Sequence, residues 1–163
     1  MTQHNLEPRV NLNDRVTGPV MKAMFGLEEP LRNAGIEERL RDLIKVRASQ
    51  INGCAYCIDM HTKDARAHGE TEQRLYALDA WRETPFYTDR ERAVLEWTEQ
   101  LTMIAGKGVP DELYGRMKGQ FSDADLVNLT LAVVQINAWN RFAITFRAPV
   151  GTYQPSAEHT AAR

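Results

Sequence analysis

Hydrophobic positions recur with a helical period along almost the whole chain. The segment 36–51 places its leucines and isoleucines on one stripe and its charged residues on the opposite side, and the segment 54–69 continues as a second helix. The pair Asn52-Gly53 between them predicts a sharp break. No segment alternates between apolar and polar residues for long enough to predict a strand. The fold class is therefore expected to be all-α.

Start and stop residues delimit the other predicted helices. These helices are expected at 19–30, 71–81, 88–106, 110–119 and 122–146. Pro30 should end or kink the first of them. Thr88 with Glu91, and Ser122 with Asp125, have the spacing of a capping box. The last helix is apolar around nearly its whole surface, which predicts a central helix or an oligomer interface.

The 163 residues fit a single domain, with a core from about residue 17 to 150 and an irregular C-terminal tail that is mobile at its end. A net charge of -2, with both signs scattered, predicts neither nucleic acid nor an anionic membrane as partner. The apolar runs are too short to span a bilayer, and the N-terminus lacks the apolar region of a secretory signal. We therefore expect a cytoplasmic protein. There, a close cysteine pair is more often catalytic or metal-binding than a permanent disulfide.

The tripeptide Gln-Ile-Asn occurs twice, at 50–52 and at 135–137, after similar apolar patterns. It raises the hypothesis of a duplicated helical unit, although a shared tripeptide arises easily by chance. In such a duplication, Trp139 and Phe142 would stand where the first copy has its two cysteines.

Both cysteines of the chain lie in one stretch, "NGCAYCIDMH", as Cys54 and Cys57, and His61 follows four residues later. On a helix these three residues fall within an arc of about 60°. Because they follow the Asn52-Gly53 break, the cysteines occupy the first turns, where free backbone N–H groups and the helix dipole favour a thiolate. The pattern predicts a redox-active dithiol with its own proton carrier.

Such a dithiol can reduce a hydroperoxide. One thiolate would attack the O–O bond and become a sulfenic acid, and the second thiol would condense with it to give a disulfide and water. His61 would take the thiol proton or protonate the leaving alkoxide. An external dithiol or small thiol would then have to reduce the pair again.

Two other readings of these residues stay open. The cysteines could be small core residues, or the two cysteines and His61 could bind structural zinc, which needs a fourth ligand. None of the remaining histidines is well placed for that role: His4, His68 and His159. A c-type haem attachment is excluded because residue 58 is Ile.

The stretches "LIKVRASQINGCAYCIDMHTKDARAHGETEQRLYAL" and "INAWNRFAITFRAPVGTY" resemble the AhpD-like alkylhydroperoxidases of the carboxymuconolactone decarboxylase family. The likeness covers the chain from about residue 20 to 155. It implies an all-helical fold that assembles into homotrimers or homohexamers. It also implies peroxidase activity through the cysteine pair, without haem, flavin or metal.

The resemblance also assigns roles to residues. The more accessible cysteine of the family maps to Cys57, with Cys54 as its partner, and the family histidine maps to His61. The family carries an acid, normally Glu, twelve positions before the first cysteine as part of a proton relay, and this position is Asp42 here. Because Asp is one methylene shorter, its contact with the histidine would need a bridging water. Glu38 is the substitute, and the alternative is that both acids belong to a solvated helix face.

The leading prediction is a thiol-dependent reductase of small organic hydroperoxides. One alternative is a dithiol–disulfide oxidoreductase that acts on a partner protein through the same residues. Another is a lactone decarboxylase, against which the cysteine pair argues because the decarboxylating members do not rely on it. A structural or binding role is the last alternative. Trp139, Asn140 and Arg141 could line the site, but as sequence they are first of all core or interface residues.

Overall fold

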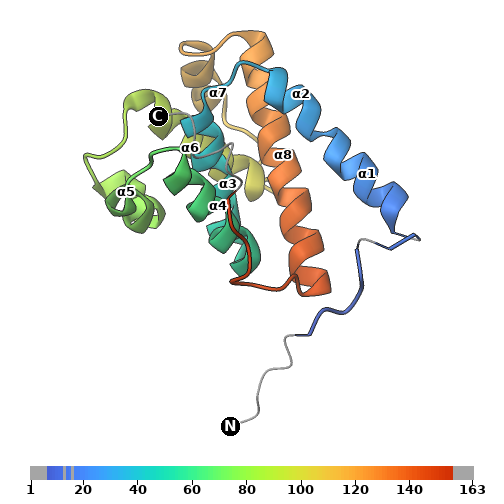
Figure 1. The fold of residues 1–163 in the computed structure, drawn as a ribbon. Coiled ribbons are helices and arrows are strands. Elements are labelled where there is room, and N and C mark those ends of the chain that lie inside the picture. The colour runs from blue at the N-terminus through green and yellow to red at the C-terminus, as the bar shows by residue number, and fades with distance from the viewer. Residues whose placement is uncertain (1–6, 13, 16, 156–163) are drawn as a thin grey trace.

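The structure is a computed structural model that describes residues 7–12, 14, 15 and 17–155. All regular secondary structure in these residues is helical, which confirms the predicted all-α class. The helices are α1 Gly18–Gly26, α2 Glu28–Asn33, α3 Glu38–Asn52, α4 Ala55–Ala67, α5 Glu72–Ala77, the 3₁₀ helix η1 Leu78–Glu83, α6 Asp89–Thr102, α7 Asp111–Lys118 and α8 Asp123–Phe146. Figure 1 shows their arrangement.

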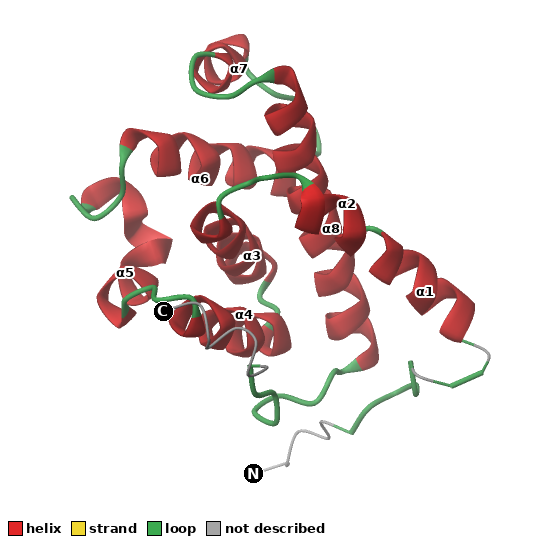
Figure 2. Ribbon diagram, turned by 45° about the horizontal axis from the view of Figure 1, so that its top comes forward, coloured by secondary structure: helices red, strands yellow, loops and turns green. Residues whose placement is uncertain are grey.

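Helix α3 lies at the centre and packs against α4, α6 and α8 (Figures 1 and 2). It carries apolar side chains on two sides. Leu40 and Ile44 belong to a core cluster shared with α6, α7 and α8. Leu43 and Val46 belong to a second cluster, shared with α4, α5 and η1. Because its two apolar sides pack into different clusters, α3 is buried on two faces, which is why it forms the centre of the fold.

The turn between α3 and α4 is built around Gly53. Its φ of +66° is the left-handed conformation that glycine adopts without steric cost. Its N–H donates to the carbonyl of Gln50 and the N–H of Cys54 donates to that of Ser49, the pattern of a Schellman motif. Cys54 is thus the last residue of the Schellman motif that ends α3, and it is also the N-cap of α4. The predicted Asn-Gly break is confirmed, and it folds α4 back along α3.

The capping boxes at Thr88 and Ser122 are both present, as predicted. Three helices differ from the prediction. The one predicted at 71–81 is divided into α5 and the 3₁₀ helix η1. The first helix is interrupted at Leu27, because Pro30 has no N–H for the carbonyl of Gly26 and its ring crowds that carbonyl. Helix α6 ends at Thr102, four residues before the predicted stop.

Helix α8 buries one side in the core and exposes apolar residues on another. Val127 and Val134 are 68% and 54% exposed and lie two turns apart on one face. The two Gln-Ile-Asn segments sit differently, since Asn52 ends α3 whereas Asn137 lies inside α8. No helix in the described part of the chain is long and apolar enough to cross a bilayer. The mobility predicted for the end of the C-terminal tail concerns residues outside those described.

Candidate functional site

The two cysteines meet at the start of α4 and are buried, with 1% of Cys54 and 2% of Cys57 exposed. Both are free thiols. The Sγ atom of Cys54 accepts the backbone N–H of Cys57 at 3.3 Å, as an N-cap side chain does. The predicted position at the helix N-terminus is therefore confirmed.

The pair titrates unequally because one sulfur donates to the other. The hydrogen bond from Cys57 is the largest cause that lowers the pKa of Cys54, to about 7, with burial opposing and the backbone N–H assisting. The same hydrogen bond and burial raise the pKa of Cys57. The dithiol therefore loses its first proton near neutral pH and holds the second tightly.

Asn140 of α8 closes the site on the side of the long helix. After the larger effects of the neighbouring cysteine and of burial, its side-chain amide acts to lower the pKa of both thiols. The amide also donates to Ser49 Oγ at 3.1 Å and accepts from Asn52 Nδ2 at 2.8 Å. Asn52 in turn donates to Asn137. This fully buried amide therefore links α3, α8 and the cysteine pair. Asn140 both holds the two helices together and acts to lower the pKa of the thiols.

His61 lies one turn after Cys57 on the same face of α4 and is 6% exposed. Burial lowers the pKa of this imidazole, and the neighbouring Asp64 carboxylate opposes the shift. Its Nδ1 is 3.6 Å from Asp64 Oδ2, which is longer than a hydrogen bond. Asp64 Oδ1 accepts a 2.6 Å hydrogen bond from the hydroxyl of Tyr153. A neutral imidazole, a carboxylate and a phenol therefore form a line that leads away from the cysteines.

The structure places Asp42 beside His68 rather than His61. Asp42 Oδ2 is 2.8 Å from Nδ1 of His68, and Glu38 Oε1 is 3.4 Å from its Nε2. The reason is the tight turn at Gly53, which makes α3 and α4 antiparallel. A residue near the start of α3 therefore faces the end of α4, where His68 lies, and not the first half of that helix. Both acids expected near His61 are engaged at the far end.

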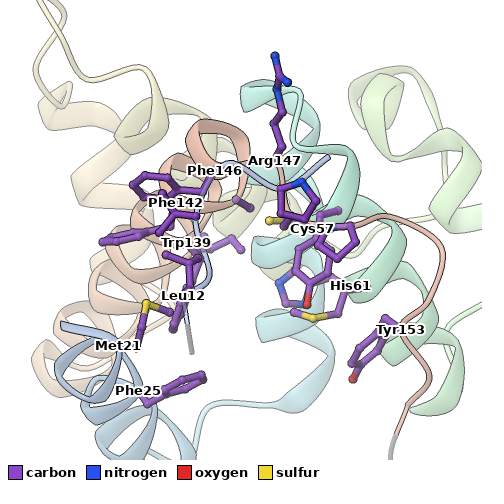
Figure 3. A pocket seen from close by; sticks show the side chains of 18 of the residues that line it. Leu12, Met21, Phe25, Cys57, His61, Trp139, Phe142, Phe146, Arg147 and Tyr153 are labelled. Carbon is purple, nitrogen blue, oxygen red and sulfur yellow. The ribbon is translucent and has the colours of Figure 1, made fainter. Parts of the chain in front are cut away.

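Cys57 and His61 line a cavity of about 870 Å³, whereas Cys54 is not part of its wall (Figure 3). Aromatic side chains of α1 and α8 form the opposite wall: Phe25, Trp139, Phe142 and Phe146. Two irregular segments complete the wall, 8–12 before α1 and 147–153 after α8. Arg9 holds the first of them on the end of α8 through hydrogen bonds to the carbonyls of Phe146 and Thr145.

Sequence reasoning named Cys54, Cys57 and His61, and the structure brings these three together. It missed Asp64, although that residue stands at i+7 from Cys57 and i+3 from His61, so the helical period was a usable signal. No sequence signal pointed to Tyr153, which reaches the site from an irregular segment. Among the described residues, no three His, Cys, Asp or Glu side chains converge as metal ligands. His4 and His159 lie outside those residues.

Comparison with known proteins gives the family. Residues 18–100 match the model of the carboxymuconolactone decarboxylase family. The uncharacterized protein YdfG of Bacillus subtilis (strain 168) is 51% identical over 124 residues, which cover 76% of this chain and 84% of YdfG.

Solved structures agree with that result. ATU0492 from Agrobacterium tumefaciens, a protein of unknown function whose proposed identity is the antioxidant defence protein AhpD, is 41% identical. It superposes with a TM-score of 0.85, over 90% of this chain and 100% of that one. The apo debrominase Bmp8 is 18% identical with a TM-score of 0.70, over 82% of this chain and 72% of Bmp8, so that likeness concerns the fold alone. The chain belongs to the carboxymuconolactone decarboxylase family and has its AhpD-like helical fold.

Proposed function

We propose that the protein is a thiol-dependent hydroperoxide reductase of the AhpD type. The observation that carries this proposal is the position of Cys57, which lines the cavity together with His61 and has Cys54 hydrogen-bonded behind it. A substrate in the cavity meets one sulfur, and the second sulfur is already in place for the next step. The likeness to a protein proposed to be AhpD supports the same assignment.

The reaction runs in two balanced steps. The Cys57 sulfur attacks the terminal peroxide oxygen and breaks the O–O bond. The proton of the Cys57 thiol passes to the Cys54 thiolate. His61 delivers one proton from solvent to the alkoxide, which leaves as an alcohol, and the terminal oxygen stays with its hydrogen on Cys57 as a sulfenic acid. Cys54 then attacks this sulfur, and the hydroxyl leaves as water with the proton of the Cys54 thiol. The disulfide is then reduced by an external small thiol that enters the cavity, or by a dithiol protein if α4 opens.

In this proposal His61 is the proton carrier, with Asp64 rather than Asp42 as its acidic partner. Burial keeps the imidazole neutral near pH 7, so it can accept a proton. The carboxylate 3.6 Å from Nδ1 would stabilise the imidazolium that forms. Such contacts are often long in the absence of substrate and tighten during the reaction.

Burial of both thiols favours this function over thiol exchange with a partner protein. A protein disulfide would have to reach sulfurs that are 1% and 2% exposed. A small hydroperoxide or a small thiol can instead enter through the cavity. Thiol exchange with a partner protein is therefore the second candidate function, because α4 would have to open before a protein could reach the sulfurs.

The decisive experiment counts free thiols in the reduced protein before and after one equivalent of cumene hydroperoxide. We expect both thiols to disappear, and Cys57→Ser to block the loss. The variant Cys54→Ser should keep the first step only and accumulate a sulfenic acid that a 1,3-dione reagent traps. Survival of both thiols in the unmodified protein would refute the proposal.

We also propose that the chain assembles with copies of itself. Val127, Leu131 and Val134 form a stripe on α8, and both valines are more than half exposed. A single small domain leaves the two valines largely in water, whereas a symmetric oligomer would cover them together with the outer part of Leu131. Light scattering should give a mass of three or six chains that falls in the variant Val134→Glu. A monomeric mass for the unmodified protein would refute this assembly.

A further inference from the structure

We infer that the cavity beside Cys57 binds an organic carboxylate, whose acid group is held by Gln135 and Lys45 and whose apolar body packs on the aromatic wall. The inference deepens the proposed function, on which it rests for one point only: the physiological ligand would be a hydroperoxide that carries a carboxylate. Binding of the carboxylate itself does not depend on peroxidase chemistry.

Gln135 is the first support. Its side chain is 1% exposed, lines the cavity, and has a buried Nε2 without a hydrogen-bond partner among the described residues. A buried donor without an acceptor costs free energy in the empty protein. A ligand that brings an acceptor atom to this point would remove that cost. The amide can therefore recognise a ligand by donating a hydrogen bond to one of its oxygens.

The charges of the cavity wall are the second support. Lys45 lines the cavity and makes no ion pair with any described residue. Its charge acts on His61, which places it near the proposed proton carrier. Among the described residues of the wall, the cations are Lys45, Arg9 and Arg147, and the anion is Glu28. Because the wall carries more positive than negative groups, an anionic ligand is favoured.

The apolar part of the wall selects the rest of the ligand. Phe25 and Trp139 pack against each other in a tilted arrangement with ring centroids 5.1 Å apart, and Trp139 contacts Phe142 in the same way at 6.4 Å. Figure 3 shows these rings, with Met21 and Leu12, on the side opposite Cys57 and His61. A hydrophobic body would cover this wall, while hydrogen peroxide would leave it in contact with water. The cavity therefore fits an amphipathic molecule with a single acid group.

Calorimetric titration of the cysteine-free protein (Cys54→Ser with Cys57→Ser) tests this. The probes are octanoate and methyl octanoate, which share an apolar chain and differ in charge. Octanoate should bind about tenfold more tightly than the ester, because a hydrogen bond to a charged group is stronger than one to a neutral group. Equal binding of the two probes, or no binding of octanoate, would overturn the inference.

Two variants locate the acid group. Gln135→Leu should weaken octanoate binding roughly tenfold, and should raise the melting temperature because the unpartnered donor is gone. Lys45→Met should remove the preference for octanoate over its ester. Gln100→Leu and Lys118→Met are the matched controls. These side chains lie outside the cavity wall and hydrogen-bond to Gly108 and Asp123, so their replacement should leave octanoate binding unchanged. Unchanged binding in Gln135→Leu would contradict the role of this amide.

The outcomes separate this inference from the proposed function. Octanoate binding in a protein whose thiols survive cumene hydroperoxide would keep the carboxylate site and refute the peroxidase. Rapid thiol oxidation without preference for octanoate would keep the peroxidase and refute the carboxylate site.

Discussion

Tyr153 donates a 2.6 Å hydrogen bond to Asp64 and so ties the segment after α8 to the helix that carries both the cysteines and His61. The same segment is held twice more, because Lys63 Nζ donates to the carbonyl of Tyr153 and the N–H of Gly151 donates to Asp59. Of these contacts, only the one to Asp64 leads on to the imidazole. This separation allows the electrostatic role of Tyr153 to be tested apart from its role in packing.

Replacement of Asp64 by Asn should lower the pKa of His61 further. The carboxylate is the group that opposes the effect of burial on this imidazole, and the amide carries no charge to replace it. Titration of the ring signals by NMR would measure the shift. If the protein is a peroxidase, the limb of the pH–rate profile that reports neutral His61 should move to lower pH by the same amount.

Replacement of Tyr153 by Phe should move the pKa of His61 in the opposite direction. Without the phenol hydrogen bond, the Asp64 carboxylate keeps its full charge for the imidazolium, so the pKa rises. Tyr76→Phe is the matched control, because it removes a phenol hydrogen bond to the carboxylate of Glu72 without touching Asp64. Shifts of one sign in both Asp64→Asn and Tyr153→Phe, or a shift in the control, would contradict this role.

The reactivity of the dithiol should depend on Asn140. In the unmodified protein the rate of alkylation by iodoacetamide should rise with pH through a midpoint near 7, the pKa of Cys54. Asn140→Asp removes a donor from the thiolate and adds a negative charge, so the midpoint should move to higher pH. Asn128→Asp makes the same change about 18 Å away along α8 and should leave the midpoint in place. An unchanged midpoint in Asn140→Asp would show that the amide does not act on the sulfurs.

The burial of His61 should make folding sensitive to acid. Its pKa is lowered from 6.5 in the folded protein, so below that pH the unfolded chain binds more protons than the native one. The free energy of unfolding should therefore fall as the pH drops below 6.5, by up to about 1.4 kcal/mol per pH unit until the folded pKa is reached. His61→Gln should lose this part of the slope in urea unfolding at pH 5 to 7. An identical slope in the variant would mean that another group causes the acid sensitivity.

Replacement by alanine should have opposite effects on stability at two glycines, Gly53 and Gly115, because their backbone conformations differ. Gly53→Ala should destabilise the protein by about 1–2 kcal/mol, because its φ of +66° strains a residue with a Cβ. Gly115→Ala, inside α7 with open space around the added Cβ, should stabilise it by up to about 1 kcal/mol. Urea unfolding measures both. Equal stability of Gly53→Ala and the unmodified protein would show that the turn before Cys54 tolerates another conformation.

The features that depend on local spacing along the chain could be predicted from the sequence. Helical periodicity gave the all-α class, and capping boxes marked the starts of α6 and α8. The Asn-Gly break and the helical period together placed Cys54, Cys57 and His61 on one face at a helix N-terminus. These features follow from the fixed rise and rotation of one helix, so neighbours along the chain suffice to define them.

The contacts between groups on different helices could not be predicted from the sequence and are set by how the helices pack. The antiparallel course of α3 and α4 brings Asp42 to His68, and packing of α8 on α3 brings Asn140 to the cysteines. Tyr153 reaches Asp64 from a segment without regular structure, and the cavity wall joins residues from both ends of the described chain. Such contacts depend on the crossing of helices and the paths of connecting segments. The one-dimensional pattern that defines each helix does not contain them, because it leaves the choice of partner helix and its register open.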